Sequence, residues 1–124
     1  MKKYTKEEVL KQYEESCEIM RQATLTGDYK ANNRECKKLI KFFKYFENNR
    51  EFAMECINEM LKSDNVVVRT EAAAYCLALK ENIDTAERVL LEISCDKSFG
   101  IFRFNAEMTL KVWKKQGYLH MYVK

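Results

Sequence analysis

Apolar residues recur along this chain with the period of an α-helix, and residues 66–79 show the pattern most clearly. As a β-strand, this stretch would place valine, tyrosine and leucine on one face together with arginine and glutamate, which suits neither a core nor a surface. As an α-helix, it has one continuous apolar stripe. That stripe consists of Val68, Ala72, Tyr75, Cys76 and Leu79. Ser63, Asp64 and Asn65 are candidate N-caps directly before it, so we predict a helix.

The same periodicity predicts three helices before this one. The first begins at the capping box formed by Thr5 and Glu8 and stops before Gly27. The second and third are expected at about residues 29–47 and 50–62. The second is expected to bury Cys36, Leu39, Ile40, Phe43 and Phe46.

Two more helices complete the chain. The fifth is expected to begin after the candidate N-cap Asp84, and the sixth to run from about Ile101 to the glycine Gly117. The connections are short throughout, so successive helices should pack as antiparallel hairpins. We therefore expect three hairpins, which pair the first helix with the second, the third with the fourth and the fifth with the sixth.

A repeat relates the fourth and sixth predicted helices. VRTEAAAYC (68–76) and FRFNAEMTL (102–110) share an apolar residue, then arginine, then alanine three positions later and an apolar residue four positions after that. They start 34 residues apart (68 and 102), a spacing typical of helical solenoids. The stretch LKSDNVVVRTEAAAYCLAL resembles the second helix of a HEAT repeat, and the segment from about Gly27 to Leu119 resembles a family of small bacterial HEAT-like domains of unassigned function.

This resemblance implies an all-α fold, an α-α superhelix of about three helical hairpins. It also implies a polar link between Asp64, in the turn between the helices, and Arg69, with Arg103 in the place of that arginine in the last unit. The last unit departs from the pattern, because Asp96 lies further from its arginine and Glu107 replaces a small residue. We expect structural roles, not catalytic ones, for Asp64, Arg69 and Arg103.

The composition favours the same fold class. The 124 residues suffice for one compact domain, which we expect to cover 1–124, and 47% hydrophobic with 33% charged residues is typical of a folded chain. The chain has no proline and only three glycines, so it lacks the usual residues of the tight turns that β-rich folds need. Long helices are the expected result.

Cysteine usage and targeting signals bear on the compartment. The five cysteines include no CxxC pair and the chain has one histidine, so neither a disulfide framework nor a metal site is indicated, and we expect the cysteines to be small buried hydrophobes. The start MKKYTKEEVL has no apolar signal core, and no apolar run is long enough for a membrane span. We expect a cytoplasmic protein with no membrane association and no cofactor.

The net charge of +3 hides a segregation of charge along the sequence. Residues 28–50 and 97–124 are mainly basic, whereas residues 51–96 are mainly acidic. Five basic residues of the second helix, spaced four, three, four and three apart, lie on one face, opposite its apolar stripe. They are Lys30, Arg34, Lys37, Lys41 and Lys44, and we name them the basic stripe.

The basic stripe has three interpretations. The first is an ordinary solvated surface. The second is a surface that attracts a partner protein of complementary charge. The third is a binding site for nucleic-acid phosphates, with Phe42 and Tyr45 beside it as stacking residues. The acidic central segment opposes phosphate binding, so we expect another protein as the partner and keep nucleic acid as the alternative. Fold-level analogy suggests a regulatory or toxin-neutralising role.

Known catalytic motifs are absent from the sequence. The sequence has no phosphate-binding loop, no GxSxG, no HExxH and no glycine-rich dinucleotide turn, so we expect a binding module and not an enzyme. The apolar end YLHMYVK (118–124) is expected to fold back over the last hairpin as a cap; its alternative role is a self-association surface. The sequence alone leaves the oligomeric state and the binding face open.

Overall fold

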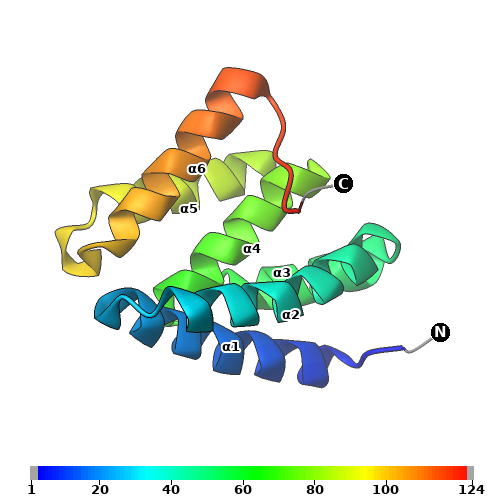
Figure 1. Ribbon diagram of the computed structural model, residues 1–124. Coiled ribbons are helices and arrows are strands. Elements are labelled where there is room, and N and C mark those ends of the chain that lie inside the picture. The colour runs from blue at the N-terminus through cyan, green and yellow to red at the C-terminus, as the bar shows by residue number, and fades with distance from the viewer. Residues whose placement is uncertain (1–2, 123–124) are drawn as a thin grey trace.

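The computed structural model describes residues 3–122, and this part of the chain is helical, with no β-strand (Figure 1). The elements are α1 (Lys6–Thr26), α2 (Tyr29–Glu47), α3 (Arg50–Met60), α4 (Val66–Leu79), α5 (Ile83–Cys95), the short 3₁₀ helix η1 (Lys97–Phe99) and α6 (Phe102–Gln116). The predicted all-α fold class and the six predicted helices are confirmed.

The ends of α1 and α4 follow their capping residues. The Thr5 hydroxyl accepts a hydrogen bond from the Glu8 amide at 3.1 Å, and Gly27 ends α1 in the left-handed region at φ +76°. Of the three candidates before α4, Asn65 is the N-cap, and its side-chain oxygen accepts from the Val67 amide at 2.8 Å. The prediction for α5 was wrong by two residues, because the helix begins at Ile83 and Asp84 lies in its first turn.

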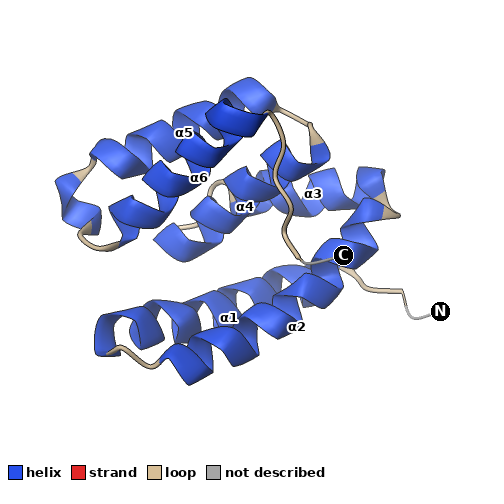
Figure 2. Cartoon of the chain, turned by 45° about the horizontal axis from the view of Figure 1, so that its top comes forward, coloured by secondary structure: helices blue, strands red, loops and turns tan. Residues whose placement is uncertain are grey.

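Each predicted hairpin pair is in contact, and further contacts join the hairpins to one another. The pair α1–α2 and the pair α5–α6 lie on opposite sides of α4 (Figures 1 and 2). Helix α4 packs against α1, α3, α5 and α6. It is therefore the central element of the fold.

The composition of α4 suits this central position. Its predicted stripe is buried, but Ala73, Ala74 and Leu77, outside the stripe, are buried as well. Alanine is the smallest side chain that still favours a helix, and it lets neighbouring helices approach from several directions. The spacing of apolar residues in this segment thus identifies a helix, but more of the helix surface is buried than the predicted stripe alone.

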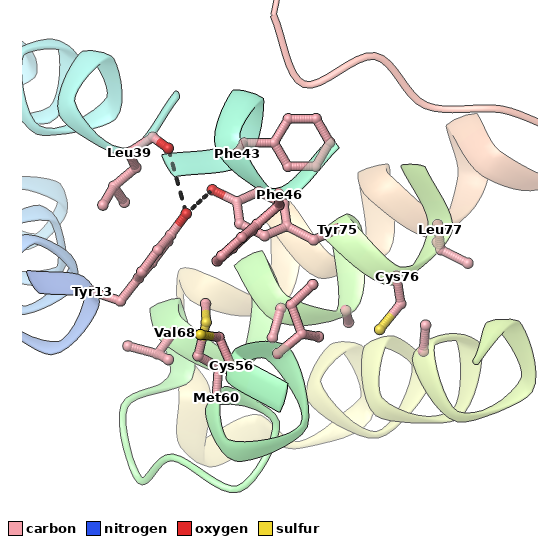
Figure 3. Close-up of a cluster of buried hydrophobic side chains, with 14 of the residues drawn as sticks. Tyr13, Leu39, Phe43, Phe46, Cys56, Met60, Val68, Tyr75, Cys76 and Leu77 are labelled. Atoms are coloured by element: carbon pink, nitrogen blue, oxygen red, sulfur yellow. Dashed lines mark hydrogen bonds between the residues drawn. The ribbon is translucent and has the colours of Figure 1, made fainter. Parts of the chain in front are cut away.

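Aromatic side chains from three helices form the core between the first hairpin and α4 (Figure 3). The ring of Phe43 lies 4.7 Å from that of Tyr75, and Tyr13 stacks on Phe46 at 6.2 Å, measured between ring centroids. Tyr13, Phe46 and Tyr75 are almost completely buried. These contacts attach α1 and α2 to the central helix.

One inward position predicted for α2 is wrong. Cys36 is exposed, whereas its neighbour Glu35 is only 1% exposed. The buried line of α2 runs through Glu35, Leu39, Phe43 and Phe46, which places Cys36 at its edge. The Glu35 carboxylate accepts from Arg34 Nε at 3.0 Å and from Lys38 Nζ at 3.2 Å, so its charge is paired at the boundary of the core.

The five cysteines divide into buried and exposed residues. All five are free thiols, and Cys17, Cys56 and Cys76 are buried as small hydrophobes, as predicted. Cys36 and Cys95 are exposed, so the prediction is wrong for these two. Within residues 3–122, no helix combines the length and the apolar character needed to cross a bilayer.

The chain after α6 folds back, but onto a different surface from the one predicted. It leaves the end of α6 and runs to α2 and α4 (Figure 1). The Tyr122 ring lies 6.1 Å from that of Phe43, its hydroxyl donates to a Glu47 carboxylate oxygen, and Lys44 Nζ lies 4.8 Å from the centre of its ring. The segment therefore joins the last hairpin to the first one, and residues 123–124 lie outside the described part.

Candidate protein-binding groove

An open groove of about 710 Å³ lies between the first and the last hairpin. The C-terminal half of α1 forms one wall, through residues between Glu14 and Leu25. The turn before α4 and its first residue, Val66, lie in the middle, and residues 98–102 form the opposite wall. The groove exists because α4 separates these two hairpins.

Large apolar side chains are exposed on both walls. Leu25 on α1 is 55% exposed and Ile101, just before α6, is 59% exposed. Phe104, Met108 and Val112 continue the apolar surface along α6 at intervals of four residues, and Phe104 is 65% exposed. Apolar patches of this kind, rimmed by polar groups, mark interaction sites on soluble proteins.

The polar side chains of the groove are held in place by hydrogen bonds between segments distant in sequence. The Ser63 hydroxyl donates to Glu14 Oε1, and Asn65 Nδ2 donates to Glu18 Oε1 at 3.2 Å. Both bonds join α1 to the turn before α4. The acidic wall is therefore pre-organised by the fold.

Glu18 is the most constrained of these carboxylates. Arg21 donates to its two oxygens from Nε and from a terminal nitrogen, both at 2.8 Å, and Gln22 donates at 3.1 Å. The hydrogen bonds from Arg21 and Gln22 lower the pKa of Glu18 to about 2. Glu18 is therefore charged at neutral pH and fully occupied by its neighbours.

The predicted link between Asp64 and Arg69 is not formed. Within residues 3–122, no hydrogen bond or ion pair joins the two side chains, and Asp64 is exposed at the edge of the groove. The Arg69 guanidinium instead lies over the ring of Phe99, 5.1 Å from its centre. Asn65, and not Asp64, is the N-cap of α4.

Arg69 and Arg103 both act on the wall formed by residues 98–102. The buried Nε of Arg69 has no hydrogen-bond partner in the described part of the chain, and the guanidinium contacts the ring of Phe99 and interacts electrostatically with Asp96. Arg103 Nε donates to the Gly100 carbonyl at 3.1 Å. Arg103 thus fixes the turn before α6, and its charge also interacts with Asp96.

The basic stripe lies on α2, away from the groove, and none of its residues lines it. All five side chains, Lys30, Arg34, Lys37, Lys41 and Lys44, are exposed. Arg34 is paired with Glu35, and Lys44 covers the ring of Tyr122.

The aromatic residues beside the basic stripe are already engaged. Phe42 and Tyr45 are half-buried, and the ring of Tyr4 lies 5.0 Å from each of them. Tyr45 also packs edge-on against Phe52 at 5.6 Å. The rings of Phe42 and Tyr45 are therefore not open for stacking with bases.

A second polar group of residues lies inside the fold. The Tyr13 hydroxyl is within hydrogen-bond distance of the Tyr75 hydroxyl, and the carboxyl of Glu71 lies near the Tyr75 hydroxyl. Burial raises the pKa of Glu71 to about 7. The group joins α1 to α4, and Cys17 and Cys36 lie near the same carboxyl.

The sequence prediction missed the groove, although one signal for it was available. Helix α6 carries two apolar stripes, an inward one through Ala106 and Leu110 and an outward one through Phe104, Met108 and Val112. An amphipathic helix that packs on one side needs only the first stripe. The second stripe indicates a surface available to a partner.

The fold and the groove define the chain as an all-helical protein with an open, partly apolar groove between two hairpins. No family model, curated protein or solved structure matches it. In residues 3–122, no three side chains of histidine, cysteine, aspartate or glutamate are grouped so that they could hold a metal ion.

Proposed function

We propose that this protein is a non-enzymatic binding module that takes a segment of another protein into the groove between its first and last hairpins. The observation that carries this proposal is the exposure of Leu25 and Ile101 on facing walls of a groove of about 710 Å³. Pre-positioned polar groups beside exposed apolar anchors are what a protein-binding surface requires. The five free thiols agree with a protein kept in the reducing cytoplasm.

A short HEAT-like α-α superhelix is part of the same proposal. The repeat places Arg69 in α4 and Arg103 in α6 at equivalent positions, and both arginines contact the short segment between α5 and α6. The hairpins are consecutive in sequence and packed on one another. Stacked helical hairpins bind partners along the surface that several repeats share, and the groove is formed in this way by the first and last hairpins.

Nucleic-acid binding through the basic stripe is the second candidate, and the structure supports it less. Arg34 and Lys44 are engaged within the molecule, and Phe42 and Tyr45 are packed. A variant with Lys37, Lys41 and Lys44 changed to glutamate tests it by retention on heparin and on random duplex DNA across a salt series. We expect either no retention of the wild type or retention that these changes leave unaltered.

Site-specific photo-crosslinking tests the protein-binding proposal. A photoreactive phenylalanine analogue replaces Leu25 or Ile101 in the groove, and Lys37 on α2 as the matched exposed control. After irradiation in cells of the source organism, the adducts are identified by mass spectrometry. We expect the same partner protein at both groove positions and not at the control position.

Two further variants guard against chance adducts. Leu25→Asp and Ile101→Asp place a charge in the groove without touching the core, so both should fold normally by circular dichroism and lose the partner in a pull-down. Partner capture that is equal for these variants and the wild type would remove the groove as the binding site. Adducts found only at Lys37 would move the site to the basic stripe.

A further inference from the structure

Building on the proposed function, we propose that the groove binds one amphipathic α-helix of a partner protein, with apolar side chains against Leu25 and Ile101 and a lysine or arginine toward Glu14 and Asp64. The groove has exposed apolar side chains on its two walls, Leu25 and Ile101, and two carboxylates, Glu14 on α1 and Asp64 in the turn before α4. The chemistry of each group specifies the part of the ligand that contacts it.

The charge of the groove selects a basic ligand. Its ionisable side chains are Glu14, Glu18, Asp64 and Arg21, and the only cation among them is already held by Glu18 through two bonds of 2.8 Å. The nearby Arg69 and Arg103 do not line the groove and are engaged by Phe99 and by the Gly100 carbonyl. An acidic ligand would meet uncompensated negative charge.

Glu14 and Asp64 are the carboxylates left for a ligand. The Ser63 hydroxyl occupies one oxygen of Glu14, and the other accepts no hydrogen bond from the described residues. Asp64 is exposed and accepts none either in this part of the chain. Because Ser63 is adjacent to Asp64 and bonded to Glu14, these two carboxylates lie in the same part of the groove.

The walls select a helix over an extended segment. The long wall is the helix α1, whose backbone hydrogen bonds are made internally, so the groove presents side chains and has no free strand edge. A ligand buried there must satisfy its own backbone groups, which a helix does by itself. Glu14 and Leu25 are separated by about 16 Å along α1, at 1.5 Å rise per residue, so about three turns of a bound helix would span both residues.

Synthetic peptides of about 16 residues, the length of four helical turns, test this inference without a known partner. One carries an amphipathic pattern of leucine and lysine, a second has glutamate in place of every lysine, and a third has the residues of the first in scrambled order. Binding is measured by calorimetry at physiological salt and mapped by amide chemical shifts. We expect the leucine–lysine peptide to bind at least about tenfold more tightly than the other two.

The map and a matched pair of variants locate the binding. Shifts should concentrate in residues 14–25 and 98–102. Glu14→Gln with Asp64→Asn should weaken binding of the leucine–lysine peptide by about tenfold, because the amides keep the size of the side chains but remove their charge. Glu51→Gln with Glu55→Gln, which changes two exposed carboxylates of α3 outside the groove, should leave the affinity unchanged.

Three results would overturn this inference. They are equal binding of the leucine–glutamate peptide, an affinity that Glu14→Gln with Asp64→Asn does not change, and sedimentation showing that the groove is closed by a second copy of the chain. A second copy of the chain is the main alternative ligand for the groove, because α6 itself carries exposed Phe104 and Met108 beside Lys111. Failure here leaves the crosslinking test of the proposed function intact, since that test makes no assumption about the charge or shape of the partner.

Discussion

The hydroxyl of Tyr13 on α1 donates to the hydroxyl of Tyr75 on α4 at 2.9 Å, inside a core where both rings are almost fully buried (Figure 3). The carboxyl of Glu71, one turn earlier on α4, lies near the Tyr75 hydroxyl. A buried hydroxyl needs a partner, and the Tyr13 hydroxyl also lies 3.4 Å from the Leu39 carbonyl oxygen on α2. The two residues therefore fix how the first hairpin is placed against the central helix.

Removing either hydroxyl should destabilise the fold. We expect Tyr13→Phe and Tyr75→Phe each to lower the free energy of unfolding by about 1 kcal/mol, because each change removes the hydrogen bond between the two hydroxyls, and in Tyr75→Phe the Tyr13 hydroxyl keeps the Leu39 carbonyl as an acceptor. The double variant should lose less than the sum, since the Tyr13–Tyr75 bond is lost only once. Urea unfolding followed by circular dichroism measures all three.

Tyr29→Phe is the matched control for these tyrosine variants. Its side chain is 67% exposed, so the same change should alter stability by less than about 0.5 kcal/mol. Strictly additive losses for Tyr13→Phe and Tyr75→Phe would show that the two hydroxyls act independently.

Glu71 should make stability depend on pH near neutrality. Burial raises the pKa of its carboxyl to about 7 from the ordinary value of 4.5. The groups that lie near it are Tyr13 and Cys17 from α1, Cys36 from α2 and Tyr75 from α4, and none of them is a cation. The charged form of this partly buried carboxyl therefore has no cation among these neighbours.

The sign follows from proton uptake. Between pH 4.5 and about 7 the folded state holds more protons than the unfolded chain, so the contribution of Glu71 to stability is complete below pH 4.5 and is lost as the pH rises through 7. We expect Glu71→Gln, which stays neutral, to exceed the wild type at about pH 8 by up to about 3 kcal/mol. At about pH 4.5 the two proteins should be closely similar in stability.

Unfolding by urea at a series of pH values measures this difference directly. Taking the difference between Glu71→Gln and the wild type cancels the other titrating groups, including Glu18. A constant difference from pH 4.5 to 8 would mean that the carboxyl of Glu71 is solvated in the folded protein.

Arg69 and Phe99 should be energetically coupled. The guanidinium lies 5.1 Å from the centre of the ring, and a contact of this type contributes about 1 kcal/mol. A double-mutant cycle with Arg69→Met and Phe99→Leu, measured by urea unfolding, should give a coupling of this size. The same cycle with Arg69→Met and Asp64→Ala should give a coupling near zero, and a large value there would restore the link implied by the repeat pattern.

Local sequence signals were sufficient to predict the helices. Thr5, Asn65 and Gly117 stand where helices begin or end, and the spacing of apolar residues identified the inward face of each helix. These signals act within one or two turns of chain, so a single sequence contains them. The exception, Cys36, lies at the edge of a stripe, where a rotation of one residue decides between burial and exposure.

The groove is formed by segments that lie far apart in the sequence, and their positions in space cannot be read from local sequence patterns. Leu25 and Ile101 are 76 positions apart (25 and 101), and only the placement of both hairpins against α4 brings them to facing walls. The Arg69 prediction failed for the same reason. Phe99, which belongs to the next hairpin, is its partner, whereas the repeat pattern offered only a residue of the same turn.

The C-terminal segment should stabilise the monomer through Tyr122. Its ring packs against Phe43, its hydroxyl donates to Glu47, and Lys44 covers the ring, so the segment holds the last hairpin to α2. We expect Tyr122→Ala to lower the free energy of unfolding by about 1–2 kcal/mol, from lost aromatic packing and one hydrogen bond to a charged group. Thermal unfolding at several protein concentrations measures the effect.

Tyr118→Ala separates this role from a general effect of the segment. Tyr118 is 46% exposed and its ring contacts only that of His120 among the described aromatic residues, so its loss should change stability by less than about 0.5 kcal/mol. A cap acts within one molecule, so the loss caused by Tyr122→Ala should be the same at every protein concentration. If Tyr122→Ala instead converted a dimer to a monomer, the segment would be a self-association surface, because the contact with α2 would then be formed between two chains.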